Sequence, residues 1–108
     1  MIFVFKHIIP SNYNSLTIWP FIFIKTVDLK NDNNLINHEK IHLKQQIELF
    51  WIFFFIWYII EYLILIIKHK NHHTAYRSIS FEKEAYLNEH NLNYLKHKKA
   101  FAFLKYLQ

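Results

Sequence analysis

Residues 35–67 form a long stretch that neither proline nor glycine interrupts. It predicts one continuous helix over residues 34–67, capped at its N-terminus by Asp32, Asn33 or Asn34. The whole chain contains no glycine, which excludes Gly-rich phosphate loops and dinucleotide-binding fingerprints.

The second half of this stretch is almost entirely apolar. Residues 47–67 contain only two charged side chains, Glu48 and Glu61. About 20 apolar residues suffice to span a bilayer, so the run predicts a helix embedded in a membrane or held tightly on its surface. Because a carboxylate in lipid is costly, Glu61 predicts either a functional site or packing against another helix. A buried core helix in a soluble protein or oligomer is the alternative.

The first half carries His38-Glu39-Lys40-Ile41-His42. Residues four apart share one face of a helix, so His38 and His42 can bind one metal ion while Glu39 stands beside it. The chain has no cysteine, so any metal must be held by His, Asp, Glu or backbone oxygen. Zinc with one position open to water is the expected cofactor, and Glu39 is placed to take a proton from that water. The alternative is a solvated helix face with two surface histidines.

A third ligand has to come from elsewhere in the chain, and Glu82 is the candidate. Ala85 follows it by one turn, and this small side chain lets a helix that starts at a Ser80 cap and runs to about Leu95 approach the metal helix. Two residues further on, Glu84 points about 200° away from Glu82 around the helix axis and is expected to be solvated.

Three other residues are weaker candidates for that ligand. On an unbroken helix Glu61 lies about 28 Å from His42 along the axis, which is beyond metal-bond reach. His72 and His73 fall in a basic loop, residues 68–74, and are expected to be solvated.

The position of the third ligand also constrains the membrane topology. After the apolar helix the chain must return to His38 and His42 without crossing lipid as a loop, which favours a monotopic or partly buried apolar helix over a full span.

The N-terminal part is expected to be β-structure. Residues 2–5 form a short apolar run, and residues 16–27 are rich in β-branched and aromatic side chains with Pro20 near the middle. Because proline cannot donate to a sheet ladder, Pro20 suggests either an edge strand or two strand pieces that meet at a bend. These runs predict a β-hairpin within residues 1–30, and residues 21–25 are the candidate edge strand. The expected fold class is α+β and mainly α.

A chain of 108 residues is one domain, and we divide it into three parts. Residues 1–30 form the hairpin, residues 34–67 the metal-site and apolar helix, and residues 78–108 the third-ligand helix with a basic tail. Residues 88–108 alternate amide, basic and aromatic side chains and suggest an amphipathic helix laid on lipid or on the core.

The net charge of +5 is concentrated after residue 67. Basic residues beside an apolar run favour an anionic membrane surface as partner and the cytoplasmic side of the inner membrane as location; a cytoplasmic protein is the alternative. No nucleic-acid-binding module surrounds the basic residues, so no nucleic acid partner is expected. A homo-oligomer formed through the apolar helix is a further alternative.

These residues resemble a known family. His38-Glu39-Lys40-Ile41-His42 with Gln45, followed by Glu82-Lys83-Glu84-Ala85, is similar to the H-E-x-x-H and E-x-x-A arrangement of gluzincin-type zinc metallopeptidases, including membrane-associated ones. More closely, the part from Ile36 onward is similar to small bacterial proteins with an H-E-x-x-H-x-x-Q helix and a later F-E-x-E-A segment. The sequence departs from the larger peptidases at Tyr86, where their motif often has Asp.

The resemblance implies zinc on His38, His42 and Glu82, with Glu39 as general base in the hydrolysis of a peptide or protein substrate. In such peptidases an edge strand beside the metal helix pairs with the substrate, which is the role expected of residues 21–25. Tyr76 or a nearby histidine would steady the oxyanion. The competing interpretation is a non-catalytic, membrane-associated helical protein, with or without a metal.

Overall fold

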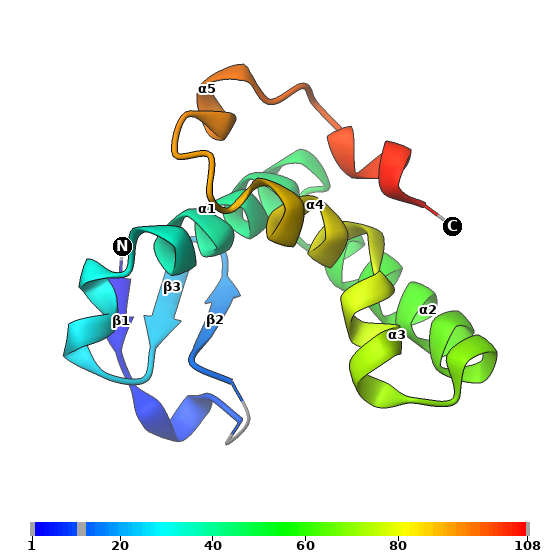
Figure 1. Ribbon diagram of the computed structural model, residues 1–108, viewed down its shortest axis with the longest axis horizontal. Helices are drawn as coiled ribbons and strands as arrows, with labels where there is room; N and C mark the ends of the chain where they lie inside the picture. Colours follow the sequence, from blue (N-terminus) through cyan, green and yellow to red (C-terminus); the bar gives the residue numbers. More distant parts are fainter. Residues whose placement is uncertain (1, 11–12, 108) are drawn as a thin grey trace.

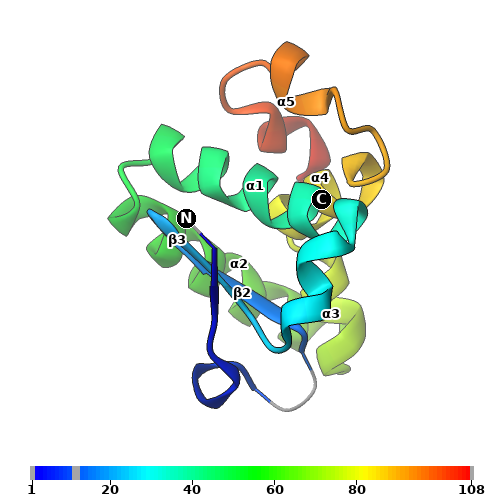
Figure 2. The ribbon, with the colours of Figure 1, turned by 90° about the vertical axis from the view of Figure 1, so that its left-hand side faces the viewer.

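The computed structural model describes residues 2–10 and 13–107. A small sheet lies on one side of the first long helix, and the C-terminal tail lies on the other side (Figures 1 and 2). The predicted α+β, mainly α, fold class is confirmed. In chain order the elements are β1 (Ile2–Val4), η1 (Lys6–Ile8), β2 (Ser15–Ile18), β3 (Phe21–Ile24), η2 (Val27–Asn31), α1 (Asn33–Glu48), α2 (Ile52–His69), α3 (His72–Ser78), α4 (Ser80–Asn88), α5 (Tyr94–His97) and η3 (Ala102–Tyr106).

The sheet contains the predicted hairpin and one further pairing. Strands β2 and β3 are antiparallel and meet at the Trp19–Pro20 bend, whereas β1 runs parallel to β3 on its other side. The strand order is therefore β1-β3-β2, and the prediction that residues 21–25 form an edge strand is wrong. Strand β3 is central because Ile22 and Ile24 are both fully buried and pack with Ile36 of α1. The edge strand beside α1 is β2.

The predicted single helix over residues 34–67 is wrong at one point, because the chain turns between α1 and α2. Phe50 and Trp51 adopt positive φ angles of 53° and 66° there. This conformation costs a residue with a Cβ atom about 1–2 kcal/mol. The turn folds α2 back, which brings the Phe54 ring to within 6.3 Å of the His42 ring and the Tyr58 hydroxyl to Glu82. The buried contacts that follow offset the backbone cost.

The start of α1 agrees with the prediction. The Asp32 carboxylate accepts a hydrogen bond from the backbone N–H of Leu35 at 3.1 Å, so Asp32 is the cap. The predicted loop over residues 68–74 is shorter than expected, because Asn71 caps α3 by accepting from the N–H of Thr74.

The C-terminal part differs from the prediction in two ways. Helix α4 ends at Asn88, well before residue 95, and the tail forms two short helices, α5 and η3, in place of one amphipathic helix. Phe103 of η3 is buried against Trp57 of α2 and Phe81 of α4. The tail therefore completes a core that α2, α3 and α4 begin.

Glu61 explains how α2 and α4 are joined. Its carboxylate accepts hydrogen bonds from the backbone N–H and from the hydroxyl of Ser80, both at 2.7 Å. The expectation that Glu61 packs against another helix is confirmed. The expectation that the Ser80 side chain caps α4 is wrong, because its hydroxyl donates to Glu61 instead. A negative charge at this helix start is also favoured by the helix dipole.

Replacing Glu61 by alanine should destabilise the fold by about 3 kcal/mol, because it leaves two buried donors of Ser80 without an acceptor. The free energy of unfolding from denaturant titration measures the effect. The matched control is Ile60→Ala on the same helix, where the side chain is 54% exposed and the expected loss is below about 1 kcal/mol. Equal losses for both variants would contradict the role of Glu61.

The outward side of α2 is apolar and lies at the surface. Eight of its apolar side chains are each at least half exposed: Ile52, Phe53, Ile56, Ile59, Ile60, Leu63, Ile64 and Ile67. We call these residues the α2 apolar face. By length and composition α2 is the one helix of the described residues that could cross a membrane, and 11% of its residues are buried.

Candidate metal centre

One turn of α1 supplies two imidazoles to a buried cluster. His38 and His42 are each 6% exposed, and their Nε2 atoms lie 3.2 Å apart. The helical spacing puts both rings on the same face of α1, and that face is turned toward α4.

Glu82 of α4 completes the cluster. Its Oε1 atom lies 3.1 Å from Nε2 of His42 and 3.3 Å from Nε2 of His38. A tetrahedral ion with bonds of about 2.0–2.1 Å holds its ligand atoms about 3.3 Å apart, so the three atoms match the ligand triangle of such an ion. Ala85 is fully buried, in keeping with a close approach of α4 to α1. The three residues thus form a set that could hold a metal ion.

The far nitrogen of each imidazole is occupied by an acceptor. Nδ1 of His38 lies 2.9 Å from a carboxylate oxygen of Glu89, and Nδ1 of His42 lies 2.8 Å from the amide oxygen of Gln45. Both acceptors favour a hydrogen on Nδ1, which leaves Nε2 as the nitrogen that faces the shared point. Outer partners of this kind orient metal-binding histidines in proteins.

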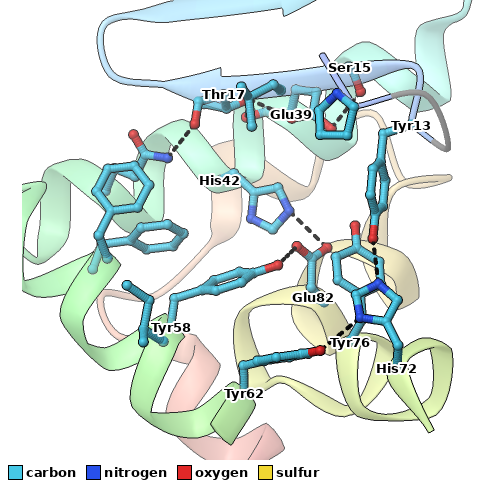
Figure 3. A pocket seen from close by; sticks show the side chains of 16 residues that line it. Tyr13, Ser15, Thr17, Glu39, His42, Tyr58, Tyr62, His72, Tyr76 and Glu82 are labelled. Carbon is cyan, nitrogen blue, oxygen red and sulfur yellow. Dashed lines mark hydrogen bonds and ion pairs between the residues drawn. The ribbon is translucent and has the colours of Figure 1, made fainter. Parts of the chain in front are cut away.

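The second oxygen of Glu82 is also held. The hydroxyl of Tyr58, on α2, donates to Oε2 at 2.7 Å, so Oε1 is the oxygen that remains directed at the imidazoles (Figure 3). Glu82 therefore offers one oxygen to the cluster.

The cluster is electrostatically suited to a cation. Burial lowers the pKa of His42, but the neighbouring carboxylates, Glu82 above all, outweigh burial and raise it to about 9. Burial raises the pKa of Glu82, but His42 and His38 outweigh burial and hold it well below its usual range. The carboxylate is thus ionised, and the site stabilises positive charge next to it.

Glu39 lies beside the cluster and is held by the sheet. Its two carboxylate oxygens accept hydrogen bonds from the hydroxyls of Ser15 and Thr17, both on β2. Ser15 and Thr17 are two residues apart, so both side chains lie on the face of β2 that is turned toward α1. The strand thereby fixes the direction of the Glu39 carboxylate.

A cavity of about 450 Å³ opens beside these residues. Glu39, His42 and Glu82 line one part of it (Figure 3). Phe54 and Ile59 of α2 belong to its apolar wall. A second cavity, of about 380 Å³, lies on the side of His38 and is more polar. Glu39 and Tyr76 line both cavities, so the candidate centre can be reached from two directions.

Tyr76 lines both cavities, and its hydroxyl accepts a hydrogen bond from the hydroxyl of Tyr86 at 3.4 Å. Burial, followed by the nearby Glu82 carboxylate, raises its pKa well above the usual range, so the phenol keeps its proton. His72, in contrast, is engaged by the hydroxyls of Tyr13 and Tyr62 at 3.0 and 2.8 Å and is not in the His38, His42 and Glu82 cluster.

Several residues of the site were not predicted correctly. Glu84 was expected in solvent, yet it is completely buried and bonded to Gln45, Tyr94 and Lys98. The spacing of Gln45, one turn after His42, is a signal that it can reach the ring. Tyr58 carries no such signal, because it approaches Glu82 only through the turn between α1 and α2.

Comparison of the chain with family models, with curated proteins and with solved structures finds no match.

Proposed function

We propose that this protein is a zinc-dependent hydrolase of peptide bonds. The observation that supports it best is the buried triangle of Nε2 of His38, Nε2 of His42 and Oε1 of Glu82, next to a carboxylate that lines a cavity. Two imidazoles and one carboxylate with a fourth position open are the ligand set of catalytic zinc in several peptidases.

Each residue of the site has a task in this proposal. Bound zinc would polarise the substrate carbonyl and make a water more acidic. Glu39 takes a proton from the attacking water and passes it to the leaving amine, because its carboxylate is fixed by β2 and faces the cavity. Tyr76 keeps its proton and lines the same cavity, so we assign it as the hydrogen-bond donor to the carbonyl oxygen.

The edge of β2 is the surface for an extended substrate in this proposal, in place of residues 21–25. Its outer side is already used at two points by Gln46, which donates to the carbonyl of Thr17 and accepts from the N–H of Trp19. A substrate strand would therefore pair with β2 at Ser15, beside Glu39, and end where Gln46 begins.

Incubating the protein with a mixture of unstructured peptides tests the activity. New peptide termini should appear in mass spectra with zinc-loaded protein, disappear after chelation and return when zinc is added back. Cleavage that persists unchanged in the chelator would contradict a zinc-dependent reaction, and absence of cleavage with one zinc bound per chain would favour the non-catalytic alternative.

We further propose that the α2 apolar face lies along an anionic bilayer, on the cytoplasmic side of the inner membrane. Basic residues Lys68 and Lys70 end this helix, and anionic headgroups complement them. The opposite side of α2 packs into the core, where Phe54 and Leu65 are buried with side chains of α3 and α4, Ala75 and Phe81 among them. A full span would carry these contacts into lipid, so a helix parallel to the surface fits better.

Vesicle binding tests this location. The protein should sediment with vesicles containing phosphatidylglycerol, and the double variant Ile56→Asp and Ile60→Asp should lose most of that binding because it places two charges on the α2 apolar face. Leu87→Asp on α4 is the matched control, since Leu87 is 68% exposed but lies outside that face. Equal vesicle binding by all three proteins would contradict the proposal. So would a dimer in lipid-free solution in which a second copy of the chain covers the α2 apolar face.

A further inference from the structure

The C-terminal tail reaches the candidate metal centre through a buried charge. The Nζ atom of Lys98 lies 3.2 Å from Oε2 of Glu84 and 3.1 Å from Oε1 of Glu48. Its side chain is 0% exposed, as is that of Glu84. The hydroxyl of Tyr94, on α5, donates to the same Oε2 atom of Glu84 at 2.6 Å. Residues of the tail therefore hold one oxygen of Glu84 in place.

The other oxygen of Glu84 faces Gln45. The side-chain NH₂ group of Gln45 donates to Oε1 of Glu84 at 2.9 Å and to the backbone carbonyl of Phe81 at 3.1 Å. With its nitrogen committed to two acceptors, the amide can present only its oxygen to Nδ1 of His42, at 2.8 Å. Gln45 is 0% exposed, so water does not substitute for these partners.

The direction of this amide matters for metal binding. A histidine that binds a metal through Nε2 carries a hydrogen on Nδ1, and that hydrogen needs an acceptor. The oxygen of Gln45 is that acceptor. A reversed amide would place its NH₂ group against the hydrogen on Nδ1, which brings two donors together in a buried site.

We infer that Glu84 is a positioning residue for the metal centre: it fixes the direction of the Gln45 amide, which in turn orients His42 for Nε2 coordination. Tyr94 and Lys98 act through Glu84, so the tail completes the centre although none of its residues touches the cluster. This role rests on the proposed metal centre and adds to it a chain of contacts from Lys98 to His42.

Exchanging Glu84 for glutamine is the informative change, because it preserves the size of the side chain. Tyr94 and Lys98 are donors and will keep the oxygen of the introduced amide on their side, which turns its NH₂ group toward Gln45. Gln45 must then reverse to accept from it, and its own NH₂ group faces His42. The double variant Gln45→Glu and Glu84→Gln restores an acceptor next to His42. The Phe81 carbonyl loses its Gln45 donor in the single and in the double variant alike, so the two differ in the group that faces His42.

The zinc dissociation constant, measured by competition with a chromophoric chelator, tests the inference. Glu84→Gln should bind zinc about 10- to 100-fold more weakly, and the double variant should recover most of that loss. Glu48→Gln is the matched control, because it changes the other carboxylate on Lys98, whose hydrogen bonds go to Lys98 and to the N–H of Phe101. The zinc affinity of this variant should stay within about twofold of wild type.

Proton NMR of the zinc-loaded protein provides a second readout that does not depend on zinc affinity. The hydrogen on Nδ1 of His42 should give a slowly exchanging imidazole resonance, which Glu84→Gln should lose and the double variant regain. Absence of that resonance in the wild type would overturn the inference. So would wild-type zinc affinity in folded Glu84→Gln, or a folded double variant that stays as weak as the single one. Failure of wild-type protein to bind zinc would instead refute the metal centre itself.

Discussion

Alanine in place of His38 is expected to remove zinc from the purified protein. The wild type should carry about one zinc per chain, since His38, His42 and Glu82 offer one set of three ligand atoms. Loss of an outer partner of a zinc ligand already costs about 10- to 100-fold in affinity. Loss of the ligand itself should therefore cost more than about 100-fold, and elemental analysis after dialysis should find the variant free of zinc.

The matched control for this change is His73→Ala. His73 is exposed at the start of α3 and is not a member of the buried cluster, so the variant should keep its zinc. Equal zinc contents in the two variants would contradict the assignment of His38. A wild type that is purified without metal and whose stability does not change when zinc is added would favour the competing interpretation of a helical protein without a metal.

Glutamine in place of Glu39 is expected to abolish peptide hydrolysis while leaving zinc bound. The amide occupies the same space beside Ser15 and Thr17 but cannot accept a proton from water. A positioned general base contributes about 10²- to 10⁴-fold to a rate, so kcat should fall by that factor. Initial rates on a peptide that the wild type cleaves, together with zinc content, measure both parts of the prediction.

Glu48→Gln serves as the control for this rate measurement. Glu48 lies at the end of α1 and bonds to Lys98, away from the cavity that Glu39 lines, so its turnover should match the wild type. Hydrolysis retained at the wild-type rate in Glu39→Gln would defeat the role of Glu39 as general base. A loss of zinc together with activity would show that Glu39 supports the metal rather than the proton transfer.

The sequence was most informative where one short-range rule decides the geometry. The four-residue spacing of His38 and His42 places two rings on one face of any helix, and the structure keeps that helix intact across them. Asp32 caps α1 for an equally local reason. Glu82 was predicted from its neighbour Ala85, and the structure brings its carboxylate to both imidazoles.

Features that depend on distant packing could not be predicted in this way. No proline or glycine marks the turn at Phe50 and Trp51. The contacts of α2 with the rest of the protein stabilise this turn instead. Glu84 was expected in solvent because the sequence predicts only its direction on its own helix, which is away from Glu82. Its partners come from α1 and from the tail, Lys98 among them, and only the folded chain brings them to the far side of α4.

The central claim is that two imidazoles of α1 and one carboxylate of α4 bind the same ion. Crystals of the zinc-loaded protein, with anomalous diffraction measured on both sides of the zinc absorption edge, test it most directly. We expect one anomalous peak within about 2.0–2.2 Å of Nε2 of His38, Nε2 of His42 and Oε1 of Glu82. A peak coordinated by other residues, or no peak in a protein that binds zinc in solution, would contradict it.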